Sequence, residues 1–299
     1  MGELFVLLER DAMHCIQAKS ILSARNGMNL YRGCQHACIY CDSRSRVYGM
    51  EHEFEDVAVK ENGLELLEQA LRKKRRLCMI GTGSMSDPYM PLERELGYTR
   101  RALGLIYKYG FGATLITKSD LVLRDIDLLS KINERAKCVV QMTLTTCDER
   151  LCKILEPGVC TTKRRFEVLC ALRDAGIPTV VWLSPILPFI NDTAENINGI
   201  LDYCESAGVK GIINFGMGLT LRDGNREYFY AALERDFPGL RDKYIRVFGE
   251  SYGCMSPENA ALMALFHRRC EKTGIMHDND AIFQYLNEFE KRDVQLSLF

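Results

Sequence analysis

Short apolar runs alternate with amphipathic segments along the first two thirds of the chain, from about residue 28 to residue 215. The runs are rich in Val, Ile, Leu and Met and are bounded by Gly, Pro or charged residues, which is typical of strands buried on both faces. They predict six strands, at residues 28–32, 77–81, 113–117, 138–143, 179–183 and 211–215.

Amphipathic segments of helical length separate these predicted strands. Residues 64–75 place leucines at helical spacing on one face, and residues 164–175 end at Gly176, a signal for the end of a helix. Thr193 is positioned to cap the first turn of another helix, which Gly208 ends. This alternation of strands and helices predicts a parallel sheet with right-handed crossovers.

The predicted fold class is α/β: a partial (β/α)6 TIM-like barrel with a C-terminal helical extension. A complete eightfold barrel needs about 250 residues, whereas the alternation covers only residues 25–215. Beyond this core the pattern predicts helices with no strand between them, at residues 223–236, 257–272 and 281–291. We therefore expect one domain over residues 1–299, with the extension at 216–294 and a tail at 295–299.

The composition is ordinary for a globular protein, with 47% hydrophobic and 26% charged residues among 299. A formal net charge of −1 gives no overall field that would attract nucleic acid or an anionic membrane. The first 20 residues lack the apolar core of a signal peptide, and prolines interrupt the apolar run at 180–190. We therefore expect a cytoplasmic protein with no membrane partner.

Three of the thirteen cysteines lie close together directly after the first predicted strand. Cys34, Cys38 and Cys41 have the spacing C-x3-C-x2-C, and three thiolates on one loop can each bind one iron of a cubane cluster. The fourth iron then stays open to a small molecule. Coincidentally close buried cysteines are one alternative, and a zinc site with His36 or Asp42 as fourth ligand is another; the spacing favours the cluster.

The cysteine loop, with Tyr40 before its last cysteine, resembles the signature of the radical S-adenosylmethionine (SAM) superfamily. Further segments occur in an order that resembles the spore photoproduct lyase-like group of this superfamily: residues 81–89 with Pro91 and Glu93, then 99–100, 117–119, 123–125 and 155–157. The resemblance covers roughly residues 25–215. It implies the same barrel fold that the hydrophobic pattern predicts.

The resemblance implies a [4Fe–4S] cluster whose open iron binds SAM. An electron from a flavodoxin-type or ferredoxin-type donor would cleave SAM to a 5′-deoxyadenosyl radical, which abstracts a substrate hydrogen. Tyr40 would lie against the adenine, and Ser86 and Asp87 would contact the amino-acid moiety or the ribose. Lys118 would bind the SAM carboxylate, and Thr143, at the end of the fourth strand, is a further polar candidate.

One departure from the group limits the prediction of the substrate. Spore photoproduct lyase has a hydrogen-donating cysteine near the end of its second strand, but residues 81–88 contain none and Cys78 lies at the strand start. DNA photoproducts or a related nucleic-acid reaction are candidates. The alternatives are a protein or RNA substrate, or a non-catalytic zinc or sensing Fe–S module that recruits a partner. Arg124 and Glu156 are expected to form a structural ion pair.

Two features bear on partners. Basic runs at 72–76, 163–165 and 267–269 are typical of solvated helix faces, and phosphate contact is the alternative. The last five residues, Gln-Leu-Ser-Leu-Phe at 295–299, resemble the short peptide by which bacterial DNA-processing proteins bind the sliding clamp. The alternative for this tail is packing of its apolar residues against the core.

Overall fold

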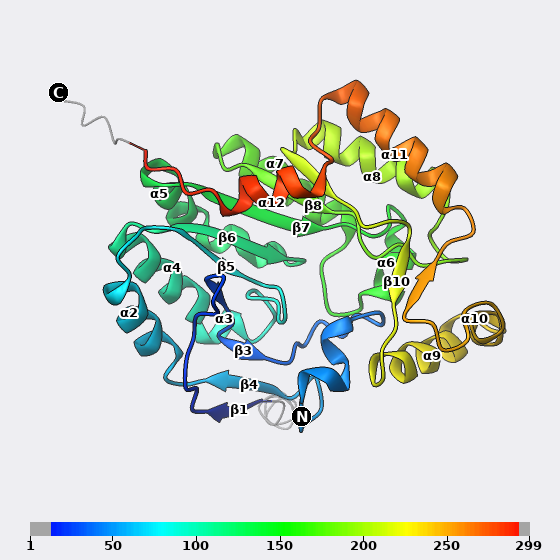
Figure 1. Cartoon of the computed structure of the whole chain (residues 1–299), viewed down its shortest axis with the longest axis horizontal. Coiled ribbons are helices and arrows are strands. Elements are labelled where there is room, and N and C mark those ends of the chain that lie inside the picture. The colour runs from blue at the N-terminus through cyan, green and yellow to red at the C-terminus, as the bar shows by residue number, and fades with distance from the viewer. Residues whose placement is uncertain (1–12, 293–299) are drawn as a thin grey trace, which may run out of the picture.

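A computed structural model describes residues 13–292, which are built around a parallel sheet of six strands (Figure 1). The strands follow one another in chain order across the sheet: β2 (Gly27–Met28), β5 (Met79–Thr82), β6 (Gly112–Thr117), β7 (Cys138–Thr143), β8 (Thr179–Trp182) and β9 (Gly211–Ile213). β2 and β9 form the two edges, so the barrel is partial and does not close. The predicted fold class is thereby confirmed.

Five of the six predicted strands lie within two residues of their expected positions, but the first is divided. Residues 28–32 contain the end of β2 and then β3 (Tyr31–Arg32), which pairs antiparallel with β4 (Val57–Lys60) in a second sheet. After the two residues of β2, which pair with β5, the chain leaves the main sheet and pairs with β4 instead. At this change the Lys60 backbone N–H donates to the Leu30 carbonyl, 3.0 Å away. β1 (Met13–Ile16) completes this second sheet beside β4.

Helices cover the outer face of the main sheet (Figure 1): α2 (Gly63–Lys73), α4 (Tyr98–Tyr109), α5 (Ile126–Arg135), α7 (Thr162–Asp174) and α8 (Ala194–Ala207). Two shorter helices, α3 (Glu93–Leu96) and α6 (Glu149–Leu155), follow β5 and β7 in the chain. The predicted cap of α8 is present, because Thr193 Oγ1 accepts a hydrogen bond from the Asn196 backbone N–H at 3.2 Å. Gly208 ends this helix in the left-handed conformation that glycine favours.

The C-terminal extension contains the three predicted helices and also elements that the sequence pattern did not predict. The predicted helices are α9 (Asn225–Asp236), α11 (Asn259–Thr273) and α12 (Asn279–Asn287). The additional elements are α10 (Leu240–Phe248) and an antiparallel pair of strands, β10 (Gly218–Thr220) and β11 (Gly253–Met255). The extension is mainly helical as expected, but the expectation that no strand separates its helices was wrong, because strands of three residues carry no readable periodicity.

Apolar packing ties these layers together. The main core lies between the sheet and its helices, and α12 covers the last strands through Ile282 and Leu286, which pack against Val139, Val180 and Ile213. Within residues 13–292, every helix is too short or too polar to span a lipid bilayer. The tail at 295–299 lies outside the described residues.

Candidate active site

The cysteine loop is held on one side by the segment before β4 and the loop after β5. The Cys34 backbone N–H donates to the Phe54 carbonyl at 2.8 Å, and Ser86 Oγ donates to the Gly33 carbonyl at 2.5 Å. Gly33 has a φ of +90°, and a β-carbon there would lie 2.5 Å from the Phe54 oxygen. Only glycine fits this approach, so the loop begins at a fixed position.

The segment after α6 holds the other side of the loop. The Ile39 backbone N–H donates to the Leu155 carbonyl at 3.0 Å, and the Gly158 N–H donates to the His36 carbonyl at 3.0 Å. His36 Nδ1 lies 2.9 Å from the Gly158 carbonyl oxygen. A β-carbon on Gly158 would lie 2.7 Å from the Gln35 carbonyl, so the motif at 155–158 is a support of the cysteine loop.

The three cysteine side chains line a cavity of about 100 Å³. Cys34 and Cys38 are buried and Cys41 is half-buried. Burial, with a smaller contribution from Asp87, raises the pKa of the Cys34 thiol to about 12. Burial also raises the pKa of Cys38 well above its ordinary value, although Lys118 opposes the shift. Thiolates therefore need a strongly cationic partner here, and iron supplies one.

A single zinc ion fits this loop poorly. Thiolates that share one tetrahedral zinc lie about 3.8 Å apart, yet among residues 13–292 no set of ligand atoms within 4.8 Å of one another includes these three cysteines. The two candidate fourth ligands are directed elsewhere. His36 faces Gly158 and Asp87, and the Asp42 carboxylate accepts a hydrogen bond from Tyr48 at 2.8 Å. A cluster, in which each sulfur binds its own iron, suits this wider arrangement.

Asp87 joins the cysteine loop to the end of β6. Its carboxylate accepts hydrogen bonds from Thr117 Oγ1 and from the backbone N–H of Lys118, both at 2.7 Å. His36 Nε2 lies 3.1 Å from Asp87 Oδ2. Burial raises the pKa of Asp87, but His36 and the hydrogen bonds outweigh it and lower the pKa to about 2. Asp87 is therefore a carboxylate at neutral pH.

Lys118 is a cation close to the cysteines. It lines both the cysteine cavity and a larger cavity beside it. Its Nζ lies 5.9 Å from the centre of the Tyr40 ring. The hydrogen bonds of Lys118 are made by its backbone, whereas its Nζ forms no hydrogen bond or ion pair with residues 13–292. Burial lowers the pKa of Lys118, but Cys38 and Glu156 outweigh it and raise the pKa. The ammonium group is thus available to an anionic ligand.

A buried ion pair lies behind Tyr40. The Tyr40 hydroxyl donates to Glu156, and Glu156 is paired with Arg165, whose side chain is wholly buried. Arg124 instead pairs with Glu93 at 2.7 Å and with Asp125 at 2.8 Å. The expected Arg124–Glu156 pair was therefore wrong. The sequence does not reveal the partner of Glu156, because Arg165 lies on α7, which packs beneath the loop that carries Glu156.

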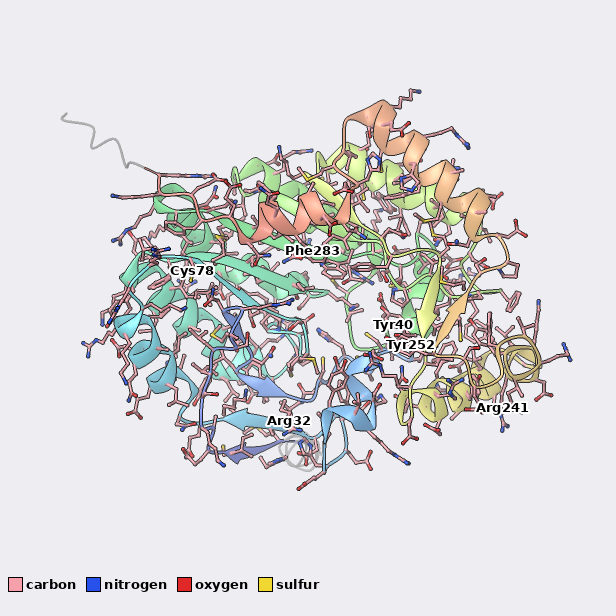
Figure 2. All side chains as sticks on the ribbon, in the orientation of Figure 1. Arg32, Tyr40, Cys78, Arg241, Tyr252 and Phe283 are labelled. Atoms are coloured by element: carbon pink, nitrogen blue, oxygen red, sulfur yellow. The ribbon has the colours of Figure 1, made fainter. Side chains whose placement is uncertain are left out.

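The larger cavity has a volume of about 610 Å³ and opens beside the cysteines. Strand ends and the extension share its lining, which includes Tyr40, Tyr48, Lys118, Thr143, Trp182, Phe215, Tyr252 and Met255. The four aromatic residues beyond Tyr40 were missed from the sequence, because three of them, Tyr48, Phe215 and Tyr252, lie outside the strands of the main sheet. Tyr40 and Tyr252 both line this cavity and are drawn close together in Figure 2, where Cys78 lies away from them, towards the other side of the view.

The site residues expected from the sequence divide into two sets. Tyr40, Lys118 and Thr143 line the larger cavity together with Cys41. Ser86 and Asp87 line only the cysteine cavity, and their polar atoms already form hydrogen bonds within the protein.

The basic runs at 163–165 and 267–269 contain arginines in ion pairs, such as Arg164 with Asp120 and Arg269 with Asp202.

Comparison with known proteins gives a family and a fold. The sequence model of the Radical SAM superfamily matches residues 28–197. An uncharacterized protein of Mycobacterium tuberculosis is 29% identical over 253 residues, which cover 81% of this chain and 72% of that protein. An uncharacterized protein of Methanocaldococcus jannaschii is 32% identical over 194 residues, covering 64% of this chain and 72% of that protein.

Among solved structures, spore photoproduct lyase complexed with dinucleoside spore photoproduct superposes with a TM-score of 0.62. The match covers 89% of this chain and 80% of that chain at 14% sequence identity. At this identity the match establishes the fold alone.

Proposed function

The chain belongs to the radical SAM superfamily, and we propose that Cys34, Cys38 and Cys41 hold the [4Fe–4S] cluster at which it cleaves SAM. The observation that carries this proposal is the arrangement of the three thiols around one cavity, beside the unpaired Lys118 ammonium group. Membership of the superfamily implies an enzyme that uses a [4Fe–4S] cluster, SAM and a reductant. We propose that residues 1–299 form one radical SAM domain.

The cluster and SAM together supply a 5′-deoxyadenosyl radical that abstracts hydrogen from a substrate. We propose that the protein contributes the orientation of SAM. Lys118 binds the SAM carboxylate, and Tyr40 and Thr143 lie along the nucleoside. Asp87 and Ser86 hold the cysteine loop and Lys118 in their relative positions. A ferredoxin-type or flavodoxin-type protein is the proposed electron donor.

Anaerobic reconstitution with iron, sulfide and reductant tests the cluster assignment. The wild-type protein should bind close to four irons and produce 5′-deoxyadenosine from SAM, whereas Cys38→Ala should produce none. Cys78→Ala is the matched control, because this half-buried cysteine lies at the far end of the sheet and should leave the product unchanged. Undiminished 5′-deoxyadenosine from Cys38→Ala would refute the assignment, and zinc near one per chain would favour a metal module instead.

We propose that the larger cavity receives a nucleobase of a nucleic acid, with damaged DNA as the first candidate. Its wall presents Trp182, Phe215 and Tyr252 beside the SAM position, and aromatic side chains stack well on bases. Deuterium transfer into 5′-deoxyadenosine tests this, with labelled oligonucleotides that carry thymine photoproducts compared with undamaged DNA, RNA and peptides. Transfer from peptides alone would refute the nucleic-acid proposal while leaving SAM cleavage intact.

We also propose that the tail at 295–299 binds a bacterial DNA sliding clamp. The support is its sequence, Gln-Leu-Ser-Leu-Phe, which places two leucines and a phenylalanine within five residues. Pull-down of the clamp should recover the full-length protein and lose a variant that ends at residue 294. Equal recovery of both proteins would exclude clamp binding through the tail.

A further inference from the structure

Two histidines and one aspartate meet on the second sheet, away from the cysteine loop. His14 Nδ1 lies 3.1 Å from Asp56 Oδ1, and His52 Nδ1 lies 4.0 Å from Asp56 Oδ2. The two imidazole rings are in edge contact, with their centres 4.6 Å apart. One ligand atom from each of the three residues lies within 4.8 Å of the other two.

The backbone brings these side chains together from separate parts of the chain. β1 and β4 are parallel, and the pairing of Met13 with Val57 places His14 next to Asp56. His52 comes from the turn that leads into β4, where its Nδ1 lies 3.0 Å from the Glu53 carbonyl oxygen. The grouping of these three side chains therefore depends on the register of β1 and β4, and not only on the contact between His14 and Asp56.

The geometry points to a binding site for a zinc-type divalent cation at His14, His52 and Asp56. Imidazole nitrogen and carboxylate oxygen are ligands that zinc prefers, at about 2.0–2.2 Å, so that neighbouring ligand atoms lie roughly 3.3 Å apart. The His14–Asp56 separation of 3.1 Å already matches this value. His52 Nδ1, 4.0 Å from Asp56 Oδ2, must give up its contact with the Glu53 carbonyl to bind the ion. The side chains of His14, His52 and Asp56 are 39%, 21% and 34% exposed, so an ion can enter and water can complete its coordination.

A cation at this site would stabilise the support of the cysteine loop. Phe54, whose carbonyl accepts the hydrogen bond from the Cys34 N–H, lies between His52 and Asp56 in the chain. Binding would join β1 to this segment and restrict its movement. The site is independent of the proposed function, because none of its three residues lines the cysteine cavity.

Zinc titration of the cluster-loaded, full-length protein under anaerobic conditions tests the site. The wild type should bind one additional zinc per chain, and zinc at about 100 times its Kd should raise the melting temperature by about 5 °C. His14→Ala and His52→Gln should each weaken binding at least about tenfold. His267→Ala is the control, because His267 lies beside another histidine, His277, with ring centres 5.3 Å apart.

Cobalt distinguishes this site from the cysteines. Co²⁺ bound by histidine and aspartate lacks the intense thiolate-to-cobalt charge-transfer absorption that cysteine ligands produce. A tightly bound cobalt without this absorption, lost in both His14→Ala and His52→Gln, supports the site even in protein that fails to assemble a cluster. Zinc affinity unchanged in both variants, or lost equally in His267→Ala, would overturn the proposal.

Discussion

Replacing Arg165 with methionine should destabilise the protein far more than the same change at its neighbour Arg164. Arg165 is completely buried, where it pairs with Glu156 and donates to the Thr143 carbonyl at 2.7 Å. The Arg165→Met substitution leaves the Glu156 carboxylate buried without its cation. Removing one partner of such a pair costs about 3–5 kcal/mol, a large share of the roughly 5–15 kcal/mol that stabilises a typical protein.

Arg164 provides a matched control, one residue away on the same helix. Its side chain is 44% exposed and pairs with Asp120 and Glu167 at the surface. Exposed pairs of this kind contribute about 0–1 kcal/mol. Arg164→Met should therefore change the free energy of unfolding by less than about 1 kcal/mol.

Urea unfolding of the two variants, followed by circular dichroism, measures the difference. With a denaturant slope of about 3 kcal/mol per M, Arg165→Met should lower the urea midpoint by about 1 M or more. It should also speed the loss of the cluster, because Glu156 holds Tyr40 and the adjacent Leu155 holds Ile39 in the cysteine loop. Equal midpoints for the Arg165 and Arg164 variants would refute the assigned role of the buried pair.

Three further predictions follow from the site. Gly83→Ala should lower the melting temperature and weaken SAM binding, because φ is +98° and a β-carbon would lie 2.1 Å from the Ile116 carbonyl oxygen. Its control is Gly104→Ala, in open space on α4, which should raise the free energy of unfolding by about 0.5–1 kcal/mol. Because the folded pKa of Asp87 is lowered to about 2, its stabilisation should be complete above the ordinary value near 3.8 and disappear as pH falls towards 2. Urea midpoints at several pH values should show this, with a flatter profile for Asp87→Asn. Lys118→Met should raise the KM for SAM at least tenfold while the iron content stays near four, and an unchanged KM would exclude the carboxylate contact.

The sequence predicted the parts of the molecule that depend on local pattern. Strands buried on both faces carry continuous apolar runs, so β7 was placed residue for residue and four others nearly so. The cysteine spacing was readable because all three cysteines lie on one loop. The first strand was misread because its partner changes from β5 to β4 between Met28 and Tyr31, and a change of partner leaves no periodic signal in the strand itself.

Contacts between distant elements could not be predicted in the same way. Glu156 was assigned to Arg124, although its partner is Arg165, because charge alone does not reveal which helix packs beneath a loop. Ser86 and Asp87 were identified as polar residues at a strand end, but their bonds to Gly33 and Thr117 depend on how two loops meet.

The parts of the molecule that the sequence predicted carry the cysteines, whereas the parts that it did not predict line the proposed substrate cavity. The wall beside the cysteines comes from strand ends, and Thr143 is buried there. Phe215, Tyr252 and Met255 also line this cavity; they are 59%, 52% and 43% exposed and come from the loop after β9 and from β11 with the residue before it. Exposed side chains on loops and short strands are little constrained by core packing, so they can change without disturbing the cysteine loop. If the larger cavity receives the substrate as proposed, substrate selectivity should depend mainly on residues from 215 onward, where the hydrophobic pattern carries least information.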